Sequence, residues 1–122
     1  MALKGDKKGI GFKYALQGLG TIFKRERNFR IQILALFIVI IAGLVFKLSP
    51  IEWAIILIVS SLVLAFETIN SIIELMIDYL KPEIHPIAKK IKDMSAGTVL
   101  IVAIAATIIG LLIFGRRILL LL

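Results

Sequence analysis

The sequence predicts an all-α integral membrane protein, in which an N-terminal amphipathic surface helix precedes three transmembrane helices that form a helical bundle. Of its 122 residues, 60% are hydrophobic, whereas soluble domains are about 45–50% apolar. The mean hydropathy is +1.03. The 15 Lys and Arg residues outnumber the 8 Asp and Glu residues, and most of them flank the apolar runs. This distribution favours membrane topology signals over a nucleic-acid surface, and the lack of cysteine excludes disulfides and thiolate metal sites.

Residues 1–28 predict the surface helix. Phe12, Leu16 and Phe23 recur at helical spacing, and Lys13 falls on the opposite face. A helix with one apolar and one basic face suits the headgroup layer of a membrane. We therefore expect this segment at the cytoplasmic surface of the bilayer.

Three further segments are long and apolar enough to span a membrane. They cover residues 29–48, 50–80 and 86–117. Ser49, Pro50 and Glu52 form the pattern of a capped helix start. Lys81-Pro82 predicts the end of that helix near Leu80.

The charges predict the orientation of these spans. The N-terminal segment and the loop after residue 80 are rich in lysine and arginine, so we expect both in the cytoplasm. The first hairpin carries only Lys47 and Glu52 and is expected outside. Arg116 and Arg117 would then also lie outside, a mild exception to the rule. The whole chain is expected to be one multi-pass domain of the inner-membrane type.

Polar side chains interrupt the second span. Glu67, Asn70, Glu74 and Asp78 follow at i, i+3, i+7 and i+11, which places them on one face of a helix. Counted from Trp53 as an outer anchor, Glu67 lies about 21 Å along the helix, in the inner leaflet. A carboxylate there costs about 2.5–3.5 kcal/mol, so Glu67 should face protein and not lipid.

Several interpretations of this face are open. Glu67 could make only a structural hydrogen bond between helices, or it could act as a general base or proton carrier. With Glu74 holding a magnesium ion and Lys92-Asp93 on the same membrane side, the pattern suits phosphoryl transfer to a lipid hydroxyl. It also suits a proton-coupled exporter. On spacing alone Glu26 indicates a surface ion pair. The sequence contains no P-loop, Rossmann or zinc motif.

Four motifs extend the pattern over residues 12–100. They are Phe12-Lys13-Tyr14-Ala15 with Gly18-Leu19, Glu26-Arg27-Asn28-Phe29-Arg30-Ile31, Glu67-Thr68-Ile69-Asn70-Ser71-Ile72-Ile73-Glu74, and His85-Pro86 followed by Lys92-Asp93-Met94-Ser95-Ala96-Gly97. In this order they closely resemble the bacterial diacylglycerol kinase family, which includes the undecaprenol kinases.

The resemblance implies a homotrimer in the bacterial inner (cytoplasmic) membrane, with active sites shared between subunits. It also implies Mg²⁺ as the cofactor and ATP as the co-substrate. By this resemblance Glu67 is the general base that acts on a lipid hydroxyl. Glu26 and Glu74 are magnesium ligands and ATP-binding residues, which replaces the surface ion pair that spacing alone indicated for Glu26. Asn70 and Asp78 support the site. The remaining ATP contacts that it implies are Tyr14, Glu83, Ile84, His85, Lys92 and Asp93. Lys7 stands where the diacylglycerol enzymes of the family have an arginine.

The same resemblance indicates the lipid. The residues at 12–15, 28–31 and 96–97 look more like the undecaprenol kinases, whereas Met94 is shared with the diacylglycerol enzymes. It therefore implies transfer of the γ-phosphate to undecaprenol, with diacylglycerol as the alternative. A small proton-coupled exporter is a remote alternative, because such a protein usually has its key glutamate in the first span, whereas Glu67 is in the second.

Overall fold

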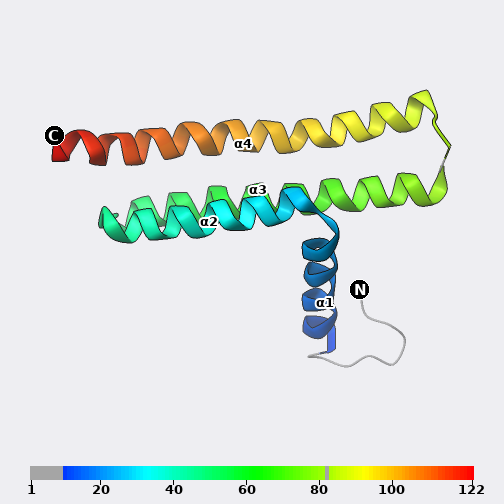
Figure 1. Ribbon diagram of the computed structural model, residues 1–122, viewed down its shortest axis with the longest axis horizontal. Coiled ribbons are helices and arrows are strands. Elements are labelled where there is room, and N and C mark those ends of the chain that lie inside the picture. Colours follow the sequence, from blue (N-terminus) through cyan, green and yellow to red (C-terminus); the bar gives the residue numbers. More distant parts are fainter. Residues whose placement is uncertain (1–9, 82) are drawn as a thin grey trace.

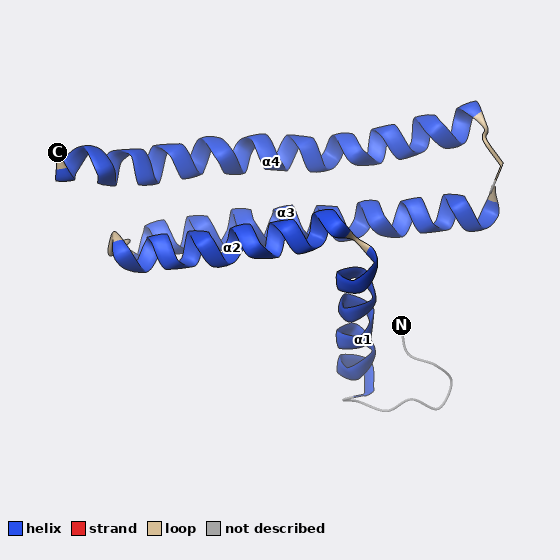
Figure 2. Ribbon diagram, in the orientation of Figure 1, coloured by secondary structure: helices blue, strands red, loops and turns tan. Residues whose placement is uncertain are grey.

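The computed structural model describes residues 10–81 and 83–122, and these residues form four helices joined by short connections. The helices are α1 (Ile10–Arg25), α2 (Arg27–Val45), α3 (Pro50–Leu80) and α4 (Pro86–Leu121). The last three run alongside one another, and α1 lies crosswise at the start of α2 (Figure 1). Helix α3 packs against both α2 and α4. No strand occurs in the described residues (Figure 2). Lys7 and the beginning of the expected surface helix fall outside them.

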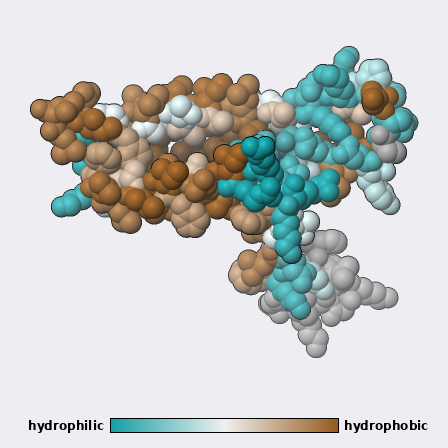
Figure 3. All heavy atoms as spheres, viewed as in Figure 1, coloured by the Kyte–Doolittle hydropathy of each residue, from teal (hydrophilic) through white to brown (hydrophobic). Residues whose placement is uncertain are grey.

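Helices α2, α3 and α4 are each long and apolar enough to cross a membrane. Their large apolar side chains point mostly outward, and Ile38, Leu44 and Leu111 are 59%, 66% and 70% exposed. An apolar surface of this extent is not stable in water and marks contact with lipid or protein. Hydrophilic residues gather instead on α1 and around the turn between α3 and α4 (Figure 3). The chain is thus built as a multi-pass membrane protein.

Helix α3 has the bounds that the sequence predicts, Pro50–Leu80. Its N-terminus is closed by a capping box: the Glu52 amide donates to Ser49 Oγ at 3.2 Å, and the Ser49 amide donates to Glu52 Oε1 at 2.9 Å. At 31 residues it extends about 46 Å, which exceeds the ~30 Å hydrocarbon core. Helix α2 has 19 residues, so the last third of α3 projects beyond it.

The other two spans differ from the predicted bounds. Helix α4 continues through Arg116 and Arg117 to Leu121, because arginine is a good helix former and a single glycine is tolerated. Helix α2 ends at Val45 because the Leu48 amide donates to the Gly43 carbonyl at 3.1 Å, which closes the last turn. Lys47 has a φ of 55°, the left-handed conformation that such an ending requires.

The turn between α2 and α3 depends on a close approach at Gly43. This glycine is buried beneath the Trp53 ring, and a Cβ atom there would lie 2.5 Å from Trp53 Cη2 and 2.8 Å from Cζ2. The two helices can pack this tightly only because residue 43 has no side chain.

We predict that Gly43→Ala lowers the free energy of unfolding by about 1–3 kcal/mol, because the tryptophan ring must move. Thermal unfolding in detergent micelles measures the change. Gly115→Ala is the matched control, since nothing lies within 4 Å of its Cβ position, and it should raise stability by about 0.5–1 kcal/mol. Adding Trp53→Phe to Gly43→Ala should recover part of the loss. Equal stability of Gly43→Ala and the unchanged protein would contradict this account.

Candidate functional site

A cluster of polar side chains lies inside the bundle, midway along α3. Glu67, Asn70 and Ser71 are 3%, 7% and 4% exposed. Glu26 and Glu74 lie close enough to Glu67 to interact with it electrostatically. Three carboxylates therefore share one region, and the one on the membrane-spanning part of α3 is the most enclosed. We call Glu26, Glu67, Asn70 and Glu74 the acidic cluster.

Glu26 reaches this cluster because of the junction between α1 and α2. It is the single residue between the two helices and has an extended backbone, with φ −109° and ψ 112°. The Arg30 guanidinium donates to the carbonyls of Phe23 and Lys24 at 2.7 and 3.0 Å, which ties the end of α1 to the first turn of α2. Because α2 pairs antiparallel with the first part of α3, its N-terminus lies near the level of Glu67.

Two amide oxygens beside Glu67 have no hydrogen-bond partner among the described residues. Gln32 on α2 and Asn70 on α3 both lie next to the Glu67 side chain. Gln32 Oε1 and Asn70 Oδ1 are buried and unpaired within the described part of the chain. A buried polar atom without a partner is destabilising. These oxygens are therefore available to accept a hydrogen bond from a bound hydroxyl group.

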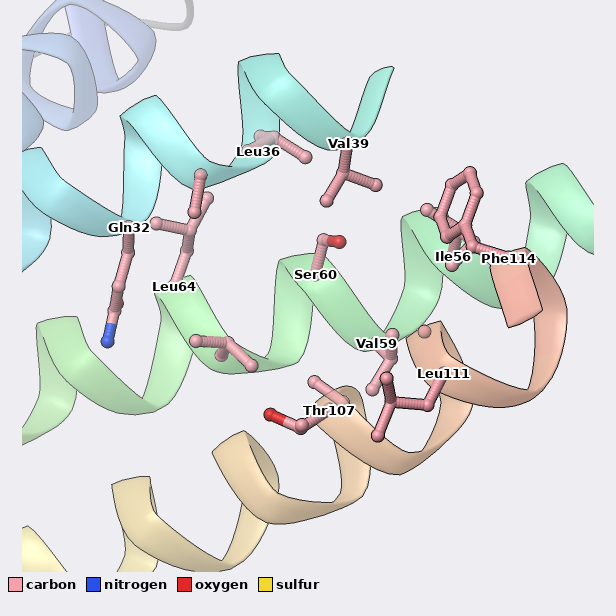
Figure 4. A pocket seen from close by; sticks show the side chains of 14 residues that line it. Gln32, Leu36, Val39, Ile56, Val59, Ser60, Leu64, Thr107, Leu111 and Phe114 are labelled. Carbon is pink, nitrogen blue, oxygen red and sulfur yellow. The ribbon is translucent and has the colours of Figure 1, made fainter. Parts of the chain in front are cut away.

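An apolar hollow of about 460 Å³ lies between α2, α3 and α4. Gln32 lines one end of it and Phe114 the other, and Val59, Ser60 and Leu64 of α3 lie between them (Figure 4). Residues 60 and 64 lie on the same face of α3 as Glu67, by helical spacing. The hollow thus extends from the acidic cluster along the membrane-spanning part of the bundle, and its volume is typical of a ligand pocket.

A second hollow, of about 250 Å³, lies at the turn between α3 and α4. The residues of the predicted site that line it are Asp78, Glu83, Ile84, His85, Lys92 and Asp93. Lys92 Nζ pairs with Asp78 Oδ1 at 2.5 Å, and Lys89 Nζ pairs with Asp93 Oδ2 at 2.6 Å. His85 Nδ1 accepts a hydrogen bond from the Ile87 amide at 3.1 Å and so caps α4. We call this group the turn pocket.

The structure leaves some of the predicted residues apart. Asp78, the partner of Lys92, lies about 16 Å along α3 from Glu67, and Glu74 falls between them. Tyr14 lies three turns before the end of α1, about 18 Å along the helix from Glu26. Glu83 pairs with Lys81 at 3.7 Å, and Ile84 is fully exposed. One chain alone therefore presents the acidic cluster and the turn pocket as neighbouring but separate groups.

The described residues contain no group of three or more His, Cys, Asp or Glu side chains placed to hold a metal by themselves. Glu26 and Glu74 nevertheless offer carboxylate oxygens near Glu67. Magnesium in such sites takes one or two carboxylates and completes its octahedron with phosphate oxygens and water. The chemistry of this donor set fits a magnesium ion bound together with a nucleotide.

Sequence reasoning missed two buried polar residues. Gln32 is the single polar residue in the apolar run of α2, and that isolation is the signal that could have assigned it to the cluster. Ser95 on α4 is 6% exposed, and its Oγ has no partner among the described residues. It belongs to a quoted motif, but nothing in its local sequence distinguishes it from an ordinary helical serine.

The chain is similar to known proteins over most of its length. The family model described as prokaryotic diacylglycerol kinase matches residues 13–114. The chain is 39% identical over 103 residues to an undecaprenol kinase of Bacillus subtilis, covering 84% of each chain. It is 38% identical over 124 residues to a diacylglycerol kinase of Helicobacter pylori, covering 92% of this chain and 90% of the other.

A diacylglycerol kinase of Synechocystis is 37% identical over 102 residues, which cover 83% of this chain and 58% of the relative. These matches confirm the resemblance that the four motifs indicate. They include the α1–α2 junction, the polar face of α3 and the start of α4. The chain belongs to the prokaryotic diacylglycerol kinase family.

Proposed function

We propose that this protein is an ATP- and Mg²⁺-dependent membrane lipid kinase that transfers the γ-phosphate to a lipid hydroxyl, with undecaprenol as the first candidate. The observation that carries the proposal is the buried carboxylate of Glu67 between an apolar hollow and a polar end of the bundle. A reaction between a membrane lipid and a soluble nucleotide requires such a boundary. The kinases among its relatives support the same activity.

Glu67 acts as the general base. The lipid hydroxyl oxygen attacks the γ-phosphorus while its proton passes to the Glu67 carboxylate. The bond from the γ-phosphorus to the bridging oxygen breaks, and ADP leaves with that oxygen. Before transfer, the hydroxyl donates its one hydrogen bond to the Glu67 carboxylate, which orients the attacking oxygen. The chain has mainly to position the two substrates and to stabilise charge.

The nucleotide phosphates are held between the two polar groups. Glu26 and Glu74 would hold magnesium, which would neutralise charge on the phosphates. Lys92 exchanges its present partner Asp78 for phosphate oxygens, while Asp93, Glu83, Ile84 and His85 surround the rest of the nucleotide in the turn pocket. A nucleotide offers Lys92 several phosphate oxygens in place of one exposed carboxylate, so this exchange is favourable.

A homotrimer supplies what one chain lacks. Lys92, at the level of Asp78, lies about 16 Å along the bundle from Glu67, and Tyr14 lies about 18 Å along α1 from Glu26. A neighbouring subunit that packs its α3–α4 turn beside the acidic cluster would complete the site. The exposed apolar side chains along α2, α3 and α4 leave ample surface for such packing as well as for lipid.

The membrane places the substrates. Phe12, Leu16 and Phe23 of α1 are 70%, 53% and 45% exposed, which suits a helix lying in the cytoplasmic headgroup layer. With α1 and the turn pocket on the cytoplasmic side, ATP reaches the site from water. The lipid hydrocarbon lies in the apolar hollow, so its hydroxyl meets Glu67. The undecaprenol kinase of Bacillus subtilis supports undecaprenol as the substrate. The diacylglycerol kinases among the relatives make diacylglycerol the alternative.

Replacing the base should abolish chemistry and leave binding intact. We expect Glu67→Gln to lower kcat by about 10²–10⁴-fold, because the amide cannot accept the proton. ATP affinity, measured by titration calorimetry in nanodiscs, should stay nearly unchanged. Ser61→Ala, at an exposed position of the same helix, is the control. Near-normal turnover of Glu67→Gln would exclude Glu67 as the base.

Filling the apolar hollow should affect long lipids selectively. Gly110 lines the hollow, and a Cβ atom there would have no neighbour within 4 Å, so Gly110→Leu adds bulk to the hollow. We expect KM for a long-chain lipid to rise about tenfold, while KM for a short-chain analogue changes little. Gly115→Leu, outside the hollow, should change neither. Equal effects of Gly110→Leu on both lipids would contradict a hydrocarbon site in the hollow.

A further inference from the structure

An ion pair joins α3 and α4 at the end of the bundle opposite the turn pocket. The Arg117 guanidinium on α4 pairs with the Glu52 carboxylate on the first turn of α3. Their side chains are 28% and 17% exposed, so the pair is largely shielded. Glu52 is itself fixed by the capping box with Ser49. Arg117 therefore binds a rigid point and not a mobile side chain.

The neighbouring contacts extend this junction to α2. One turn before Arg117, the Phe114 ring lies edge-on to Phe46, with ring centroids 6.0 Å apart. Phe46 follows directly on the last residue of α2. The junction thus links three helices at one end, and it closes the apolar hollow at Phe114. Arg116, the residue immediately before Arg117, is exposed.

The Lys92–Asp78 ion pair joins the same two helices at their other end, and the spacing between the two pairs is nearly the same along both helices. Glu52 and Asp78 are about 39 Å apart along α3, and Arg117 and Lys92 are about 38 Å apart along α4, at 1.5 Å per residue. Two ion pairs therefore hold the antiparallel helices in one register, one pair at each end. A one-turn shift of α4, about 5.4 Å, would break both.

Nucleotide binding breaks one of these two ion pairs and leaves the other intact. In the proposed reaction Lys92 leaves Asp78 for the nucleotide phosphates, and the Lys92–Asp78 pair is exposed and contributes little to stability. While nucleotide is bound, the Glu52–Arg117 pair is the ion pair left between α3 and α4 in the described part of the chain. It then keeps α4 in register with α3.

We propose that Glu52 and Arg117 are positioning residues for nucleotide binding: their ion pair fixes α4 against α3 and so sets where Lys92 meets the phosphates at the far end. The inference rests on the proposed function through the role of Lys92. It also gives Arg117 a reason to occupy the end of the chain where the positive-inside rule predicts few basic residues.

The test combines a distance with a kinetic constant. The chain has no cysteine, so two spin labels can be attached at Met76→Cys on α3 and Met94→Cys on α4. Both positions are exposed and lie near the turn pocket, and the distance between the labels reports how α4 is placed against α3. Labelled protein is diluted with unlabelled protein, so that distances within one chain dominate. Arg117→Gln and Glu52→Gln each remove one charge, and a glutamine at residue 52 keeps the capping box.

Both variants should broaden the spin-label distance distribution measured with ATP and Mg²⁺ present. They should raise KM for ATP about three- to tenfold with little change in kcat, because a small misplacement of a binding group weakens its contact. Arg117→Lys should restore most of the binding, and Arg116→Gln should leave both readouts unchanged. A merely structural role would instead lower the active fraction, and so kcat, at constant KM.

The proposal is overturned if Arg117→Gln matches Arg116→Gln in both readouts, or if it lowers only kcat. Failure of the proposed function has a different signature. The unchanged protein would then phosphorylate no lipid, and the distance distribution would still show whether Arg117 sets the register. The two ideas are therefore tested separately in one set of samples.

Discussion

The structure depends on the need to keep one carboxylate away from lipid. Glu67 lies in a helix long and apolar enough to span the membrane, and its exposure is 3%. An ionisable group at that depth is costly unless protein surrounds it. Helix α2 covers it with Gln32, the α1–α2 junction brings Glu26 near it, and Asn70 lies one turn further along α3. Arg30 holds this junction in place through its hydrogen bonds to the last turn of α1.

Because α2 is shorter than α3, the bundle has an apolar part that contains α2 and a polar part that does not. Where α2 covers α3, the shared surface is apolar and contains the hollow. Past the N-terminus of α2, the last part of α3 packs, among the described helices, only against α4. The polar residues of this part of α3 line the turn pocket. Glu67 lies at the transition. A lipid can therefore approach from one side of this residue and a nucleotide from the other, without either substrate crossing the other's environment.

Much of this arrangement could be predicted because it is local. The bounds of α3 follow from Ser49, Pro50 and Glu52, and its polar face follows from helical spacing. Contacts between helices could not be predicted in the same way, because they depend on register. The pairing of Arg117 with Glu52 and the place of Gln32 beside Glu67 both belong to this second kind. The nucleotide contact of Tyr14 is implied by family resemblance alone, and one chain does not bring it to the acidic cluster.

The most direct test of the account is a phosphate-transfer assay in nanodiscs, with labelled ATP and Mg²⁺ and with undecaprenol and diacylglycerol offered in parallel. The account predicts labelled lipid phosphate that depends on magnesium, formed faster from undecaprenol. Faster labelling of diacylglycerol would keep the kinase and change its substrate. Labelling of neither lipid, by protein shown to be folded and assembled, would contradict the central claim that Glu67 activates a lipid hydroxyl.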